Sequence, residues 1–505
     1  MKKILRAGVL FMLCAAMLAG CGEKYEEDDS KERDRDNEEV EETEDKFKDF
    51  SNTDDISYVM IYNPKIYDER KTRNELLNTG DFEDYVEAII NKADGLEEIP
   101  EILPYQGSDI LKDFPLDEVD LSGSRSGTYA MPYSVGDTHG FYCGQEKREI
   151  KEFVCRYVGD NCNIWTLDNS VSSRDIENLG KEFDKNVYEK VVDMFGEPRY
   201  ADEDGKINLL LYQFEASCLG FFHPLDLFAT GEVSPAEIAH YGINTDHAIL
   251  NINSMHIENE DVMYSTMAHE LQHLICFTDY FYTAAYGGIN MRTWLNEAMS
   301  GYVEEQLYPG VKDMEGHYEA LARSNRIRHG QSMYNFETSV TYSNFDIGVY
   351  GSVYLFSEYL ANLADGDVFL NIHNYWRESG SRKLDEAEAI VNSVPEKTYK
   401  KIDKSIDYDD KFDFNSEEEE WLSKLTLNFY LSLLNFDKND PKAYKNVKSQ
   451  TLLYDEVNPA EIEGGGRVIV ALKDGKFEIP EDADEGFVYI GLNEDFEVIT
   501  DYIIE

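Results

Sequence analysis

The motif His269-Glu270-Leu271-Gln272-His273 constrains this chain more than any other feature, because within a helix it brings two metal-binding side chains to one face. At 3.6 residues per turn, His269 and His273 lie one turn apart on one helix face, so both imidazoles can reach one ion. This spacing suits zinc. Glu270, about 100° round the helix, falls beside the open coordination position, where a carboxylate can take a proton from water. Mostly apolar neighbours predict that this helix is buried in a domain: Val262, Met263, Thr266, Met267, Leu274, Ile275 and Phe277.

A catalytic zinc site takes three protein ligands and leaves the fourth position for water. Asp279 occupies the third-ligand position of metzincin-type sites, but those sites need a tight turn with Gly where this chain has Cys276. Glu297 lies in a second amphipathic segment, where a carboxylate on the buried side is costly unless it meets a metal or a cation. The sequence therefore favours Glu297 as the third ligand, with Asp279 as the alternative. Glu304 and Glu305 are expected to be solvated or to contact the ligands, and Cys276 is expected to pack in the core.

The residues around this motif resemble the gluzincin group of zinc peptidases, and most closely the hyicolysin-type neutral metallopeptidases. The resemblance implies an α+β fold with a zincin, thermolysin-like catalytic domain, built from a mixed sheet edge, an active-site helix and a helical subdomain and flanked by small β-rich modules. It implies that His269, His273 and Glu297 bind Zn2+, that Glu270 is the general base, and that the substrate is a peptide or protein. The matching segments cover about half of the chain: Phe183 to Tyr188, Phe195 to Pro198, Asp202 to Leu211, Gly220 to Pro224, Met267 to Phe277, Trp294 to Glu297 with Ser300, and Tyr350 to Phe356.

A peptidase also needs a hydrogen-bond donor for the oxyanion that forms during attack. Tyr350, in the predicted helix after the site, is the expected donor, and His317 and His373 are alternatives. Their distance from the metal cannot be read from the sequence.

The N-terminus predicts export and a lipid anchor. Residues 1–20 have a basic start and an apolar stretch too short to span a bilayer, and Leu18-Ala19-Gly20-Cys21 resembles a bacterial lipobox. Cys21 would then be the lipidated first residue of the mature protein. Residues 21–54 are almost wholly charged, which predicts a disordered acidic tether that holds the enzyme at the extracytoplasmic surface of a bacterial membrane.

The formal net charge of −54 argues against nucleic acid and against an anionic membrane surface as partners, because both need basic patches. Two other function classes stay open. The chain could be a surface binding lipoprotein on a peptidase-like scaffold, although Glu270 would then have no use. It could also be a zinc hydrolase of a non-peptide amide or ester.

The remaining organisation is expected in three parts. Residues 55–170 form an N-terminal β-rich region, residues 171–414 the zinc metallopeptidase domain, and residues 415–505 a helix and a β-rich module. The strand expected at 247–253 is a plausible sheet edge for an extended substrate. Two weaker patterns are a calcium site at 202–205, for which a plain turn is favoured, and a hairpin that could bring Cys155 and Cys162 face to face.

Overall fold

The computed structural model describes 55–67, 132–144, 148–198, 205–214, 218–228, 233–283, 292–309, 311, 314–336, 347–364, 367–379, 385–408, 412–434, 450–453, 462–472 and 486–503. Residues 49–505 form one compact unit. Helices and two sheets are both present, so the expected mixture of helix and sheet is confirmed. No helix within these ranges is long and apolar enough to cross a membrane.

The larger sheet has six strands in the order β2-β3-β4-β5-β7-β6. Its centre is parallel, because β4 pairs with β5 and β5 with β7 in the same direction, and the outer pairs are antiparallel. Strands β5 and β7 are buried along their whole length, as expected of central strands covered on both faces. The bounds are Thr138–Cys143 for β2, Glu149–Val158 for β3, Cys162–Thr166 for β4, Ile207–Tyr212 for β5, Gly220–Phe222 for β6 and Ile249–Asn253 for β7.

The edge strands of this sheet, among the described residues, are β2 and β6, and β7 is not at an edge. The strand expected at 247–253 is confirmed, but its proposed place at the edge was wrong, because β7 pairs with β5 on one side and with β6 on the other. A strand as short as β6 has no readable alternation of apolar residues, so the sequence pattern could not identify it.

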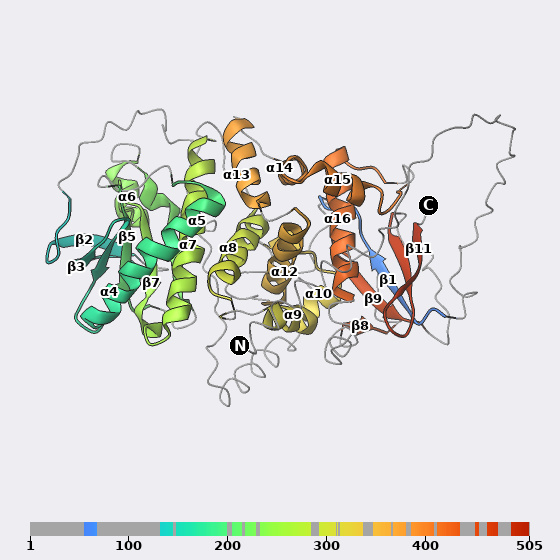
Figure 1. The fold of residues 1–505 in the computed structure, drawn as a ribbon, viewed down its shortest axis with the longest axis horizontal. Coiled ribbons are helices and arrows are strands. Elements are labelled where there is room, and N and C mark those ends of the chain that lie inside the picture. The colour runs from blue at the N-terminus through green and yellow to red at the C-terminus, as the bar shows by residue number, and fades with distance from the viewer. Residues whose placement is uncertain are drawn as a thin grey trace, which may run out of the picture. The chain divides into compact units, whose positions relative to one another are not determined.

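The strands β2, β3 and β4, which fall within the N-terminal region 55–170, belong to the same sheet as β5 and β7. The parallel step from β4 to β5 is made through a helical crossover that contacts the sheet and the long helix α7. Figure 1 shows these helices beside the strands. They are α4 at Ser173–Glu182, a π-helical segment η3 at Phe183–Val187, α5 at Tyr188–Phe195 and α7 at Glu260–Thr283.

A set of further helices follows α7 along the chain. Helix α8 packs against α7 and α12, and α12 packs against α9. Their bounds are Thr293–Leu307 for α8, Met314–Arg323 for α9, Asn325–Arg328 for α10, Ile347–Leu363 for α12, Val368–Ser379 for α13, Glu386–Ser393 for α14, Glu396–Asp403 for α15 and Glu417–Leu434 for α16. Shorter helical segments are η4 at Pro224–Leu227, α6 at Pro235–Tyr241, η5 at Ser254–His256 and η6 at Met333–Asn335.

The second sheet has five strands in the order β11-β10-β1-β9-β8. Strand β1, near the start of the described chain, lies between two strands from the C-terminal region, where Met60 pairs with Ile490 and Ile469. Strand β1 therefore completes a sheet whose other strands come from the C-terminal region. The bounds are Tyr58–Tyr62 for β1, Thr451–Leu452 for β8, Arg467–Ala471 for β9, Val488–Leu492 for β10 and Val498–Ile503 for β11.

The cysteines in the described ranges are buried, and they form no disulfide with one another. Cys155 lies opposite Trp165 in the β3–β4 ladder, and Cys162 accepts a backbone hydrogen bond from Gly159 through its carbonyl. The two cysteines are therefore not opposite one another, and the predicted facing pair was wrong. Strand β3 runs on to Val158, which pairs with Asn163, so the turn is centred on Asp160 and Asn161 and not on Val158 and Gly159 as that prediction required.

Candidate zinc centre

Helix α7 carries the His-Glu-x-x-His motif. The side chain of Asn259 accepts a hydrogen bond from the Val262 amide at 3.5 Å, and Glu260 and Asp261 lie in the first turn, where negative charge favours a helix. The helix then runs without a break to Thr283. The turn that a metzincin site needs after its second histidine is therefore absent from α7. Asp279 lies on the continuing helix, about 9 Å further along its axis than His273.

Helix α8 brings Glu297 to the two histidines. The Nε2 atoms of His269 and His273 are 2.9 Å apart, and each lies 3.6 Å from a carboxylate oxygen of Glu297. Ligand atoms bound to one zinc at about 2.0 to 2.2 Å lie roughly 3.3 Å from one another at tetrahedral angles. One donor atom from each of these residues falls within 4.8 Å of the other two, so the group could hold an ion.

A fourth side chain, Glu304, contacts the ring nitrogen of His269 that faces away from Glu297. Glu304, also on α8, places Oε1 3.0 Å from Nδ1 of His269, and the side chains of Glu297 and Glu304 are nearly inaccessible to solvent. A carboxylate on the far ring nitrogen of a histidine fixes the orientation of the ring and keeps the other nitrogen available for a metal. Glu304 therefore contacts a candidate ligand, in agreement with one of the alternatives expected from the sequence.

The electrostatics of the group favour a cation. Burial acts to lower the pKa of His269, but Glu304, Glu270 and Glu297 together raise it above its usual value. Burial, and then the charge of His269, hold the pKa of His273 far below its usual range. Buried carboxylates grouped with two imidazoles need a positive charge to balance them, and a divalent ion supplies one without protonating either ring.

Glu270 lies where α7 meets the edge strand. A Cβ atom on Gly220 would lie 2.6 Å from Cγ2 of Thr266 and 3.1 Å from Cγ of Glu270, so only glycine lets β6 approach the helix this closely. Glu270 is buried, at 6% exposure. The carboxylate beside the metal-binding pair is thus buried and lies next to β6, the last strand in the order of the described sheet.

The three candidate oxyanion donors each pack against an aromatic ring. Tyr350 lies edge-on to Phe336 at 4.7 Å between ring centroids. His317 stacks on Tyr354 at 3.8 Å, and His373 lies 5.4 Å from the ring of Phe195. The role of Tyr350 as a donor stays a prediction.

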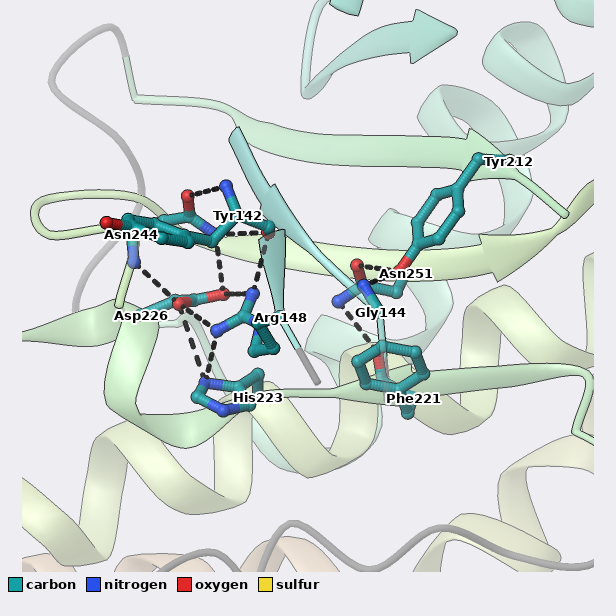
Figure 2. A network of polar contacts seen from close by, with 9 residues as sticks. All are labelled: Tyr142, Gly144, Arg148, Tyr212, Phe221, His223, Asp226, Asn244 and Asn251. Atoms are coloured by element: carbon teal, nitrogen blue, oxygen red, sulfur yellow. Dashed lines mark hydrogen bonds and ion pairs between the residues drawn. The ribbon is translucent and has the colours of Figure 1, made fainter. Parts of the chain in front are cut away.

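A buried polar network beyond the edge strand was not predicted. Arg148 and Asp226 form a bidentate ion pair, with Nη1 to Oδ1 at 2.7 Å and Nη2 to Oδ2 at 2.8 Å, and their side chains are 3% and 0% exposed. Figure 2 shows His223, Asn244 and Tyr142 gathered around this pair. The only sequence signal is the pattern Gly220-Phe221-Phe222-His223-Pro224, in which His223 follows the strand.

Several of the sequence-based predictions fall outside the described ranges. They are the signal segment at 1–20, the lipid attachment at Cys21, the acidic tether at 21–54 and the carboxylates of the calcium pattern, Asp202 to Asp204.

Two histidines one turn apart on a buried helix, with a glutamate from a second helix, are the arrangement of zinc-dependent metallopeptidases. The chain is 30% identical over 252 residues to "Neutral metalloprotease ShpI" of Staphylococcus hyicus. The match covers 47% of this chain and 52% of that relative, so the chain spans about half the length of the protein it matches. No protein-family model matches the chain. The comparison confirms the predicted resemblance to a neutral zinc metallopeptidase.

Proposed function

We propose that this chain is a zinc-dependent endopeptidase of the gluzincin type, with a zincin, thermolysin-like catalytic domain that comprises residues 171–414 together with strands β2, β3 and β4 of the same sheet. The observation that carries the proposal is the meeting of His269, His273 and Glu297 from two helices, with Glu270 beside them. The identity to a neutral metalloprotease over about half the chain supports the same reaction class.

The residues fit a zinc ion in number, type and spacing. Two imidazole nitrogens and one carboxylate oxygen leave a fourth tetrahedral position free, as catalytic sites require. Glu304 would hold His269 in the orientation that presents Nε2. When bound, zinc lowers the pKa of water to about 7 and polarises the carbonyl that is attacked.

Glu270 would carry the proton. Its carboxylate takes a proton from the attacking water and passes it to the nitrogen of the leaving amine, so that one side chain serves as base and then as acid. Tyr350 remains the proposed donor to the oxyanion.

Strand β6 would align the substrate. The amide of Asn253 donates to Leu219 O at 2.7 Å, and bonded and non-bonded pairs alternate along an antiparallel ladder. Gly220 and Phe222 therefore turn their peptide groups away from β7, toward the edge. An extended peptide can add there as a further strand, and the peptide bond nearest Gly220 then lies beside Glu270.

The proposed location is the outer surface of a bacterial membrane, with Cys21 lipidated and residues 21–54 as the tether. The apolar stretch before Cys21 is too short to remain as a membrane span, and the charged segment behind it has nothing to bury. The large negative net charge argues against nucleic acid as a partner.

Zinc content measured together with peptide cleavage tests the proposal. The purified protein should contain one zinc per chain and cleave a casein-derived peptide, a chelator should remove both, and added zinc should restore both. Zinc without cleavage of any peptide, but with hydrolysis of a simple ester or amide, would favour the non-peptide hydrolase. Zinc with no hydrolysis at all would favour a binding lipoprotein.

A further inference from the structure

The edge strand β6 is held weakly by its own ladder. It has three residues, and among the described strands it pairs only with β7. Its first residue, Gly220, is held against Thr266 and Glu270 on α7. Its last residue, Phe222, runs directly into His223 and the short helix η4, so the direction of β6 depends on what fixes that end.

That end is fixed by a fully bonded carboxylate. Asp226 in η4 accepts from both terminal nitrogens of Arg148, and also from the backbone amide of Asn244 at 2.8 Å and its side-chain amide at 3.2 Å. The amide of Asp226 donates to His223 O at 3.1 Å. Each carboxylate oxygen thus has two donors, which fixes its position in the plane of the Arg148 guanidinium.

The same guanidinium reaches the strand and the hairpin. Its Nη1 lies 2.8 Å from Nδ1 of His223, and its Nη2 donates to Tyr142 O at 3.0 Å. Asn244 donates to the same carbonyl at 2.9 Å and accepts from the Tyr142 amide at 2.7 Å. We call Tyr142, Arg148, His223, Asp226 and Asn244 the Arg148 latch, because they tie the β2–β3 hairpin to the end of β6 (Figure 2).

A second chain of hydrogen bonds runs from the same hairpin to the middle of β6. Gly144 N donates to the hydroxyl of Tyr212 at 3.0 Å, which donates to Asn251 Oδ1 at 3.1 Å. Asn251 Nδ2 then donates to Phe221 O at 3.3 Å. Figure 2 shows this chain beside the Arg148 latch, so the hairpin meets β6 at two points.

We propose that Arg148 is a positioning residue for the substrate: through Asp226 and His223 it sets the direction of β6, and so the register of a peptide paired to that strand relative to Glu270. This inference rests on the proposed peptidase function. It assigns to the β2–β3 hairpin, which precedes the catalytic helix by more than a hundred residues, a part in substrate alignment.

The chemistry of the latch suits positioning more than stability. A buried ion pair adds little net stability over apolar residues of the same volume, because both charges must leave water. A planar fork with two parallel bonds instead fixes distance and angle, which a lysine ammonium cannot do. A small displacement of the strand that binds the substrate slows the reaction, because the scissile bond must be held in position beside the general base.

The test compares Arg148→Lys with Arg156→Lys. Arg148→Lys keeps the charge beside Asp226 and loses the fork. Arg156, on β3 of the same hairpin, bonds instead to Asn169 and Ser173 in an exposed position, which makes it a matched control.

The expected result for Arg148→Lys is one zinc per chain, an approximately tenfold higher KM for a peptide extending on both sides of the scissile bond, and little change in kcat. A substrate too short to reach Phe222 should keep the parent KM, and Arg156→Lys should match the parent on both substrates. An unchanged KM for the long peptide, or an equal loss on both substrates, would overturn the proposal.

Hydrogen–deuterium exchange on the same proteins separates this proposal from the proposed function. In Arg148→Lys the segment 218–228 should exchange faster than in the parent, while 205–214, which contains β5, should not change. Unchanged exchange at 218–228 overturns the latch whatever the protein hydrolyses. Faster exchange there in a protein whose parent cleaves no peptide contradicts the peptidase function and leaves the structural part of the inference standing.

Discussion

Glu304 Oε1 lies 3.0 Å from Nδ1 of His269, so a carboxylate from α8 orients a candidate ligand on α7. Glu297, the candidate third ligand, comes from the same helix, two turns earlier. Helix α8 therefore supplies both a ligand and the support for another ligand, and a small shift of this helix would disturb the whole site.

Replacement of Glu304 by glutamine should weaken zinc binding without abolishing it. The amide can still contact His269 but carries no charge, and loss of such a partner usually costs about 10- to 100-fold in metal affinity. Competition with a coloured chelator measures the effect. Glu305→Gln, one residue further along the same helix, should bind zinc as tightly as the parent. Equal affinity in the two variants would show that Glu304 has no such role.

Removal of the third ligand should separate the two candidate sites. Glu297→Ala should lose most of its zinc, because two histidines alone bind the ion weakly. Asp279→Ala should keep its zinc, because α7 continues past His273 without a turn. Metal analysis of the dialysed proteins gives the answer, and loss of zinc from the Asp279 variant alone would point to a metzincin-like site.

The Arg148 latch should make the fold sensitive to acid. Burial, and then the charge of Arg148, lower the pKa of His223 to about 4, against an ordinary value of 6.5. Between these values the unfolded chain binds a proton that the folded chain does not, so the free energy of unfolding falls as the pH falls from about 6.5 to 4. Burial alone would raise the pKa of Asp226, but the charges of Arg148 and His223 outweigh burial and lower that pKa. The free energy of unfolding therefore continues to fall at still lower pH, where the Asp226 carboxylate becomes protonated in the unfolded chain first.

Urea unfolding at a series of pH values, measured on the parent and two variants, tests this prediction. His223→Phe should show a smaller fall in the urea midpoint between about pH 6.5 and 4.5 than the parent. His240→Gln, at an exposed position on α6, should keep the parent dependence. The same pH dependence in all three proteins would mean that His223 does not titrate as its surroundings require.

Lipid attachment can be tested by fractionation. The native protein should remain with membranes and enter the detergent phase, whereas Cys21→Ser should be shed or keep its signal segment, because the apolar stretch cannot serve as a span. Mass spectrometry of the N-terminus identifies the modification. A wild-type protein found wholly in the culture fluid, with an N-terminus beyond Cys21, would make this a secreted enzyme.

Local patterns predicted the helices and strands that carry the site. The apolar spacing around His269 and His273 corresponds to α7, and the second amphipathic segment, which carries Glu297, corresponds to α8. The strand prediction at 247–253 corresponds to β7. In each case the signal is contained in one element, where periodicity is readable.

The relationships between distant segments could not be predicted in this way. Arg148 and Asp226 are 78 positions apart, and nothing in either neighbourhood shows that one needs the other. Strand β1 pairs with strands near the other end of the chain, so its two neighbours cannot be found from its own sequence. Strand β6 is too short to carry a pattern, and the sheet edge was therefore assigned to β7.

The most direct test of the account is the Glu270→Gln variant of the chain from Ser51 onward. The amide keeps the shape of the side chain and leaves His269, His273 and Glu297 in place, but it cannot accept the proton of water. Zinc content and peptide cleavage are measured on the same preparation, beside the parent protein. The account predicts one zinc per chain and a loss of kcat/KM by several orders of magnitude. Zinc at the parent level with undiminished peptide cleavage would contradict it.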